Sequence, residues 1–195
     1  MDEAASAPRI IGGTLRGRRL AFQPDPRTRP MKDRVRETLF DLVGRAVEGA
    51  IALDLFAGTG ALGFEALSRG ASQAVFVERH FPTVDALRRS ARDLGVEDRS
   101  DIRAGDVLVW ARRLPALPAS APWLVFVSPP WPLFADRSPD LVALVTVLLA
   151  AAPAGSVMVV ESDAAWDPAA LPDPASWEQR GLPPAILHVR RGLVS

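Results

Sequence analysis

The sequence predicts an α/β fold with a mostly parallel, twisted sheet and helices on both faces. Apolar, strand-like runs alternate along the chain with helical patterns of about 10 to 15 residues, which is typical of parallel strands joined by crossover helices. A glycine-rich turn, Gly58 to Gly63, also follows directly on the apolar run 51–56. Its spacing fits G-x-G-x-x-G, the pattern by which a strand and a helix bind a nucleotide-like ligand.

The N-terminal region differs from the rest of the chain. Residues 9–22 contain two short extended stretches around Gly12 and Gly13 and a turn near Gly17, which predicts a β-hairpin. A proline-punctuated loop, 24–30, follows it. We therefore expect a flexible tail, a basic hairpin and loop appendage, and one main domain, at residues 1–8, 9–30 and 31–195.

The main domain is expected to begin with a helix over 33–47, which places its apolar residues on one stripe and Asp33 at its N-cap. Later strands are predicted at residues 51–56, 73–78, 101–105, 123–127, 156–161 and 186–192. The helices between them are predicted at residues 61–70, 82–95, 107–114 and 138–152.

Composition narrows the class of protein. A chain of 195 residues with 48% apolar and 24% charged residues suits one globular domain. With no cysteine and two histidines, disulfides, thiolate nucleophiles and a metal site are not expected. No apolar run reaches the length of a membrane span, and the polar N-terminus is unlike a signal peptide, so we expect a cytoplasmic protein.

Positive charge is concentrated near the N-terminus although the net charge is zero. Residues 9–36 hold nine basic and two acidic side chains, a local net charge of 9 − 2 = +7. This pattern fits either a solvated basic face or a footprint for phosphates, which guanidinium groups bind well. The candidate RNA-binding residues are Arg16, Arg18, Arg19, Arg29, Lys32, Arg34 and Arg36.

Polar residues follow the ends of four predicted strands, where a parallel sheet binds its ligand. Asp54 precedes the glycine turn, and Glu78 lies twenty residues after Gly58, the spacing of a carboxylate that binds ribose hydroxyls. Asp106 fits either a ligand contact or a helix N-cap. The full set of candidate cofactor-binding residues is Asp54, Phe56, Ala57, Gly58, Gly60, Glu78, Arg79, Asp106 and Val107.

The fourth strand end, Ser128-Pro129-Pro130-Trp131, favours S-adenosylmethionine over NAD as the cofactor. Two prolines cannot continue a strand, because neither donates an N–H, and they form a stiff turn. We expect this turn to present the Ser128 hydroxyl, the Pro129 carbonyl and the Trp131 ring to a flat base with an exocyclic amine. Hydride transfer has no use for such a group, so a nicotinamide-dependent oxidoreductase is the weaker hypothesis.

These motifs make the sequence similar to the RsmD family of 16S rRNA (guanine-N2)-methyltransferases, within the class I S-adenosylmethionine-dependent fold. The resemblance covers roughly residues 9–131. It rests on RIIGGTLRGRRL, RPMKDRVRETLFDLV and LDLFAGTGALGFEALSRGA, which are specific to this family, and on VFVE and VSPPW, which other amino-methyltransferases share.

The resemblance implies a Rossmann-like sheet of about seven strands, with the last hairpin strand antiparallel, that uses S-adenosylmethionine and no metal. It implies methylation of a guanine N2 amine in 16S rRNA, within an assembling small ribosomal subunit, by a monomer. Asp54, Gly58 and Gly60 would form the cofactor loop. Glu78 would bind the ribose and Asp106 the adenine amine. The target base would be held by Ser128, Pro129, Pro130 and Trp131.

Ser128 departs from the family pattern, which has Asp or Asn at this position. A serine hydroxyl accepts a hydrogen bond but carries no charge, so Ser128→Asp is expected to keep or raise activity. The sequence is also compatible with a non-catalytic or weakly active RNA-binding factor of ribosome assembly. It is compatible as well with an amino-methyltransferase that acts on another nucleic-acid base.

Overall fold

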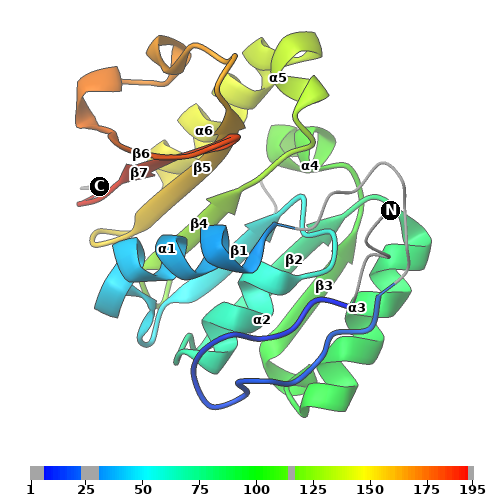
Figure 1. Ribbon diagram of the computed structural model, residues 1–195. Helices are drawn as coiled ribbons and strands as arrows, with labels where there is room; N and C mark the ends of the chain where they lie inside the picture. The colour runs from blue at the N-terminus through cyan, green and yellow to red at the C-terminus, as the bar shows by residue number, and fades with distance from the viewer. Residues whose placement is uncertain (1–6, 23–30, 114–116, 193–195) are drawn as a thin grey trace.

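A seven-stranded sheet with strand order β3-β2-β1-β4-β5-β7-β6 forms the centre of the computed structural model, which describes residues 7–22, 31–113 and 117–192 (Figure 1). Strands β1 to β5 pair in parallel, and β7 runs antiparallel to both of its neighbours. The order reverses between β1 and β4, which makes a switch point there. The strands are β1 Ile51–Leu55, β2 Gln73–Glu78, β3 Ser100–Ala104, β4 Trp123–Val127, β5 Val157–Asp163, β6 Glu178–Leu182 and β7 Ala185–Arg190.

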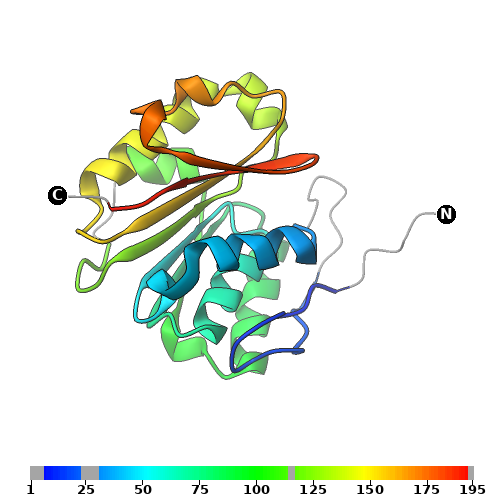
Figure 2. The same ribbon diagram turned by 60° about the vertical axis from the view of Figure 1, so that its left-hand side comes forward.

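Helices cover both faces of the sheet, as Figure 2 shows. Leu124 and Phe126 of β4 pack with the first three helices, whereas Val125 and Val127 pack with the next three. Burial on both faces explains why the central strands are continuous apolar runs. The helices are α1 Asp33–Val43, α2 Ala61–Ser68, α3 Phe81–Leu94, α4 Val107–Arg113, α5 Pro132–Asp136 and α6 Ser138–Ala151, with 3-10 turns η1 Gly44–Val47, η2 Glu97–Arg99, η3 Pro168–Ala170 and η4 Pro174–Ser176.

The predicted α/β architecture is confirmed, with differences at the ends of elements. The first helix ends at Val43, because Gly44 takes a positive φ of 57° and begins a 3-10 turn. The prediction that Asp33 caps this helix is wrong: Lys32 is the N-cap, and the Asp33 carboxylate instead binds Arg9 and Arg36. Strand β6 and helix α5 carry no sequence signal, since β6 is polar and almost wholly exposed and α5 has five residues.

The N-terminal arm, residues 7–22, is a reduced form of the predicted hairpin. A single antiparallel bridge joins Arg9 to Arg19, and Ile10 donates its backbone N–H to the Arg18 carbonyl at 2.9 Å. The arm packs closely on α2: a Cβ on Gly13, which has a φ of 72°, would lie 1.9 Å from the Ser68 carbonyl oxygen. Ile10 and Leu20 are buried in the same core as α1 and α2, so the arm is anchored to the main domain.

A buried ion network fastens the arm to α1 and α2. Glu65 is fully buried and accepts from the Ile11 backbone N–H at 2.8 Å and from Arg69 Nε at 2.8 Å, with Arg36 Nε 3.7 Å away. Arg36 is 1% exposed and also donates to the Arg9 carbonyl at 2.6 Å. The prediction that Arg36 contacts RNA is therefore wrong: its guanidinium lies inside the protein and holds three segments together.

Candidate active site

The glycine loop, residues 56–60, leaves the carboxyl end of β1 beside the switch point. Phe56, Gly58 and Gly60 have φ values of 64°, 51° and 74°, so the chain turns through three left-handed residues. A non-glycine residue with positive φ is strained and commonly marks a functional site. The Ala57 N–H donates to the Val77 carbonyl at 3.0 Å, which holds the loop against β2.

Asp54 lies beneath this loop and fixes the start of α2. Its Oδ2 accepts from the Gly63 backbone N–H at 2.9 Å, and the residue is 2% exposed. Burial raises the pKa of Asp54 to about 7, against the opposing effect of the Gly63 hydrogen bond and with a further increase from Glu78. In dinucleotide-binding folds the pyrophosphate takes the N–H groups at this helix start. Here the Asp54 carboxyl accepts from one of these N–H groups, that of Gly63.

Glu78, at the end of β2, is bound to the glycine loop as well. Its Oε2 accepts from the Gly58 N–H at 2.9 Å and its Oε1 from the His80 N–H at 2.8 Å. An ionised carboxylate has about four lone-pair sites, so each oxygen can accept one more hydrogen bond. Glu78 is therefore a preorganised acceptor pair, which suits the hydroxyl groups of a ribose.

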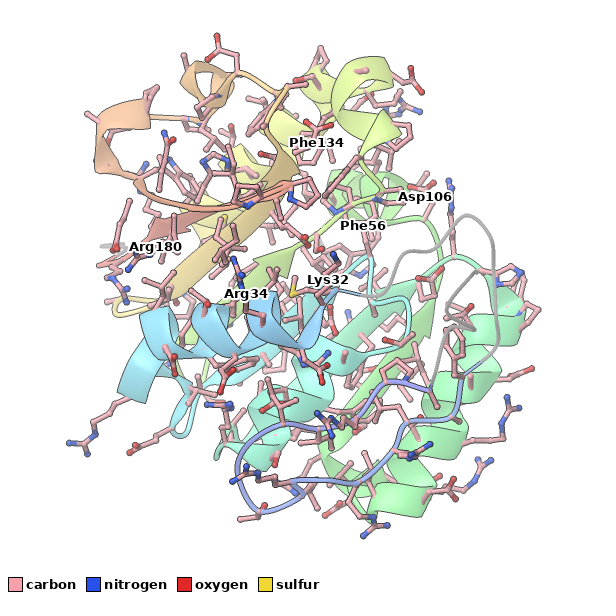
Figure 3. The ribbon with its side chains drawn as sticks, viewed as in Figure 1. Lys32, Arg34, Phe56, Asp106, Phe134 and Arg180 are labelled. Carbon is pink, nitrogen blue, oxygen red and sulfur yellow. The ribbon has the colours of Figure 1, made fainter. Side chains whose placement is uncertain are left out.

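Asp106 precedes α4 and caps it. Its Oδ1 accepts from the Leu108 N–H at 2.8 Å and the Val109 N–H at 3.4 Å, so the N-cap interpretation is correct. Its Oδ2 lies 3.9 Å from Arg79 Nη1 and retains acceptor capacity for an amine. Figure 3 labels Phe56, which follows β1, and Asp106, which precedes α4, at the carboxyl ends of the parallel strands.

The hydrogen-bond acceptors at this edge of the sheet fit a cationic nucleoside better than a dinucleotide. Glu78 and Asp106 offer two carboxyl groups above the buried Asp54, and Arg79 is a basic side chain that pairs with Asp106. Carboxylates accept hydrogen bonds from hydroxyls and amines, attract a sulfonium and repel phosphate. The described residues hold no cluster of three or more metal-ligating side chains.

The Ser128–Trp131 turn continues from β4, on the other side of the switch point. The carbonyls of Pro130 and Trp131 accept from Leu133 and Phe134 at 2.9 Å and so begin α5. Within the described part of the chain, no such bond is made to the Pro129 carbonyl. Trp131 is half-buried and packs against the apolar cores on both faces of the sheet. The turn thus has a fixed aromatic ring and a carbonyl with spare acceptor capacity.

The Ser128 hydroxyl donates a hydrogen bond to Oε2 of Glu161 on β5. Glu161 is 9% exposed, and burial raises the pKa of its carboxyl, opposed by the bond from Ser128. Glu161 was not predicted as a site residue from the sequence. The available signal was an acidic residue that ends the apolar run 156–161, as Glu78 ends β2.

The predicted RNA-binding residues fall into two groups. The arm packs on the C-terminal ends of α2 and α3, where Leu15 binds Ser68 and Arg18 binds the Asp93 carbonyl. Because α3 has fourteen residues, its two ends are separated by about 20 Å. Arg18 therefore belongs to a region away from the carboxyl ends of the strands. Arg16 lines a pocket with Asp33 and Glu37 of α1, and Arg29 lies outside the described residues.

Lys32 and Arg34 belong to the second group. Helix α1 packs on the β4-β5-β7 face, and its last turn is beside the end of β7, where Arg191 donates to the Leu42 carbonyl. The helix therefore begins near the carboxyl ends of β4 and β5. Figure 3 shows Lys32 directly before α1, Arg34 on α1 and Arg180 on β6. Arg180 and Glu161 are both paired with Leu187, which places Arg180 about 10 Å from Glu161 on the same face.

The fold and the switch-point site together define a Rossmann-like protein of the class I methyltransferase type. The chain belongs to the family described as "Conserved hypothetical protein 95", whose model matches residues 8–180. No helix among the described residues is long and apolar enough to cross a membrane.

Known proteins resemble the chain at both the sequence and the structural level. Ribosomal RNA small subunit methyltransferase D of Escherichia coli K12 is 39% identical over 126 residues, which are 63% of this chain and 60% of that protein. The Buchnera aphidicola (Acyrthosiphon pisum) protein of the same name is 33% identical over 122 residues, 63% and 62% of the two chains. The chain thus spans less than two thirds of the length of these curated relatives.

The solved structure of E. coli yhhF is 29% identical, with a TM-score of 0.75 over 97% of this chain and 99% of that one. An RNA methyltransferase from Salinibacter ruber in complex with S-adenosyl-L-homocysteine shares 19% identity and a TM-score of 0.59, over 86% of this chain and 95% of its own. At that identity the likeness concerns the fold alone.

Proposed function

We propose that this protein transfers a methyl group from S-adenosylmethionine to the exocyclic N2 amine of a guanine in 16S ribosomal RNA. The observation that carries the proposal is the Ser128–Trp131 turn, which lies across the switch point from the acidic glycine-loop site. The names of the curated relatives support a ribosomal RNA substrate. The guanine N2 position comes from the resemblance of the motifs.

The chain holds the cofactor through carboxylates and loop backbone. Glu78 would accept from the ribose hydroxyls and Asp106 from the adenine amine, while Phe56, Ala57, Gly58 and Gly60 would shape the loop, with Arg79 and Val107 beside them. Asp54 acts beneath them by fixing Gly63. When bound, the sulfonium supplies an electrophilic methyl group.

The target base is held from the β4 side. The lone pair of a guanine amine is delocalised into the ring, so the amine is a weak nucleophile that must be oriented. Ser128 and the Pro129 carbonyl would accept its hydrogens, and Trp131 would stack on the base. Most of the rate enhancement then comes from proximity and alignment. The nitrogen–methyl bond forms as the methyl–sulfur bond breaks, and the amine afterwards loses a proton to water.

The RNA approaches along the basic start of α1. Lys32 and Arg34 are exposed, and within the described residues neither has an ion-pair partner. They would bind phosphates while the base is flipped into the site. We infer that the substrate is RNA in an assembling small subunit and that the enzyme acts as a cytoplasmic monomer.

Mapping of methylated guanines in 16S rRNA from a deletion strain tests the proposal. We expect one N2-methylguanine to disappear and to return when the gene is restored. An unchanged methylation map would contradict the proposed function.

A further inference from the structure

Ser128 and Glu161 form a pair across neighbouring parallel strands. The β4–β5 register places Phe126 opposite Val159 and Val127 opposite Val160, so Ser128 lies opposite Glu161 one residue further on. Phe126 and Val159 belong to the core on the α1 side of the sheet. Because side chains alternate along a strand, Ser128 and Glu161 lie on this same side.

Glu161 is an unusual residue for this position. It is 9% exposed, and in the described part of the chain its carboxylate has the Ser128 hydroxyl as a partner but no basic side chain. Burying a charge without a counter-ion costs stability. A fold has no structural reason to keep such a group, whereas functional sites commonly do.

The hydrogen bond decides what Ser128 can offer to a substrate. A hydroxyl has one proton and two acceptor lone pairs. A serine without a fixed partner could turn its proton toward the target amine and occupy the nitrogen lone pair that must attack. With its proton donated to Glu161, Ser128 presents only lone pairs.

We propose that Glu161 is a positioning residue for methyl transfer, which holds the Ser128 hydroxyl as an acceptor for the target amine and places a negative charge behind it. The inference rests on the proposed function and adds a residue to it. As the nitrogen–methyl bond forms and the methyl–sulfur bond breaks, positive charge develops on the amine. The Ser128 oxygen, polarised by Glu161, stabilises that charge through the amine N–H.

A double-mutant cycle measures this role through single-turnover methyl transfer to small-subunit particles that lack the modification. Glu161→Gln should slow transfer about 10- to 100-fold, with little change in cofactor affinity or in the KM for RNA. In a Ser128→Ala background the same change should have little further effect, because no hydroxyl remains to be oriented. Glu97→Gln, an exposed neutralisation on η2, is the matched control and should behave as wild type.

Moving the carboxylate from position 161 to position 128 provides a rescue test. Ser128→Asp alone places two carboxylates side by side, so we expect it to be slow. Ser128→Asp combined with Glu161→Gln leaves one carboxylate, at position 128, and should recover activity to within about tenfold of wild type. Such recovery also shows that a chain carrying Glu161→Gln folds and binds its substrates.

Two results would overturn the inference while leaving the proposed function intact. One is wild-type activity in Glu161→Gln, and the other is an equal loss from this change with and without the Ser128 hydroxyl. If the wild-type protein transfers no methyl group to RNA, both the proposed function and this inference fail.

Discussion

The Asp54 carboxylate accepts a hydrogen bond from the Gly63 backbone N–H at 2.9 Å, at the start of α2. This contact distinguishes between NAD and S-adenosylmethionine, which both remain possible cofactors on the G-x-G-x-x-G spacing alone. A pyrophosphate needs the positive end of this helix, whereas here a buried acid accepts from the Gly63 N–H of that end. We therefore expect the glycine pattern to bind a nucleoside without phosphates.

Cofactor choice follows from this contact. We expect calorimetry to show binding of S-adenosylmethionine and S-adenosylhomocysteine and no binding of NAD. Glu78→Gln should weaken S-adenosylhomocysteine about tenfold or more, because the amide replaces an acceptor oxygen with a donor. Glu97→Gln is the exposed control. NAD binding without sulfonium binding would contradict the assignment of this edge.

The buried Asp54 predicts a pH-dependent stability. Its pKa is about 7 in the folded protein against an ordinary value of 3.8, so the folded chain holds a proton that the unfolded chain has released. Stability from this group is full below pH 3.8 and is lost as the pH rises through 7. Asp54→Asn keeps an oxygen for Gly63, and should match wild type near pH 4 but exceed it at pH 8 by on the order of 4 kcal/mol.

Denaturant unfolding of both proteins across this pH range checks the prediction. Asp98→Asn, an exposed change on η2, serves as the control. Parallel pH profiles for Asp54→Asn and wild type would mean that Asp54 ionises as freely in the folded chain as in the unfolded one.

Arg34 and Arg36 are neighbours with opposite expected roles. Arg36→Ala removes a buried cation from Asp33 and Glu65 and should lower the free energy of unfolding by about 3 kcal/mol. Arg34→Ala removes an exposed cation and should change stability by less than about 0.5 kcal/mol while weakening RNA binding. Thermal unfolding and RNA titration of the two variants distinguish these roles. Equal stability of the two variants would contradict the buried network.

Features of the fold and the site that depend on local sequence pattern could be predicted, whereas features that depend on tertiary contacts could not. Apolar patterns predicted β1, β2, β4, β5, β7 and four of the helices closely, because burial leaves a strong signal. The partly exposed edge strand β3 was predicted as a short strand as well. Strand β6 was missed, since Gln179 and Arg180 sit on an exposed edge with no apolar alternation. Strand ends predicted Glu78 and Asp106 as neighbours of the glycine loop.

The roles of individual side chains were harder to predict than their neighbourhood. Helical spacing places Arg36 on the same face as Leu39, Phe40 and Val43, which is the signal that separates it from exposed Arg34. Its partner Glu65 comes from a different helix and could not be predicted. The sequence also suggested that Ser128→Asp would keep or raise activity. The contact with Glu161 reverses that expectation, since the new carboxylate would meet an existing one.

RNA binding should depend on the basic residues nearer the site, which are Lys32 and Arg34 at the start of α1 and Arg180 on β6. Replacing Lys32, Arg34 and Arg180 with alanine should flatten the log–log salt dependence of RNA binding by about two units. Replacing Arg16, Arg18 and Arg19 should flatten it by less than about one. Filter binding across a salt series measures both slopes. An unchanged slope in the first triple variant would mean that these residues form a solvated basic face and do not contact RNA phosphates.

Single-turnover methyl transfer tests the proposed activity most directly. Purified protein is mixed with labelled S-adenosylmethionine and small-subunit particles that lack the modification, and the labelled nucleoside is identified by mass spectrometry. We expect one N2-methylguanine per particle, and a Trp131→Ala variant slowed by roughly 5- to 100-fold through loss of about 1–3 kcal/mol of base stacking. Tight binding to the particles with no transferred methyl group would contradict the proposed activity and indicate a non-catalytic assembly factor.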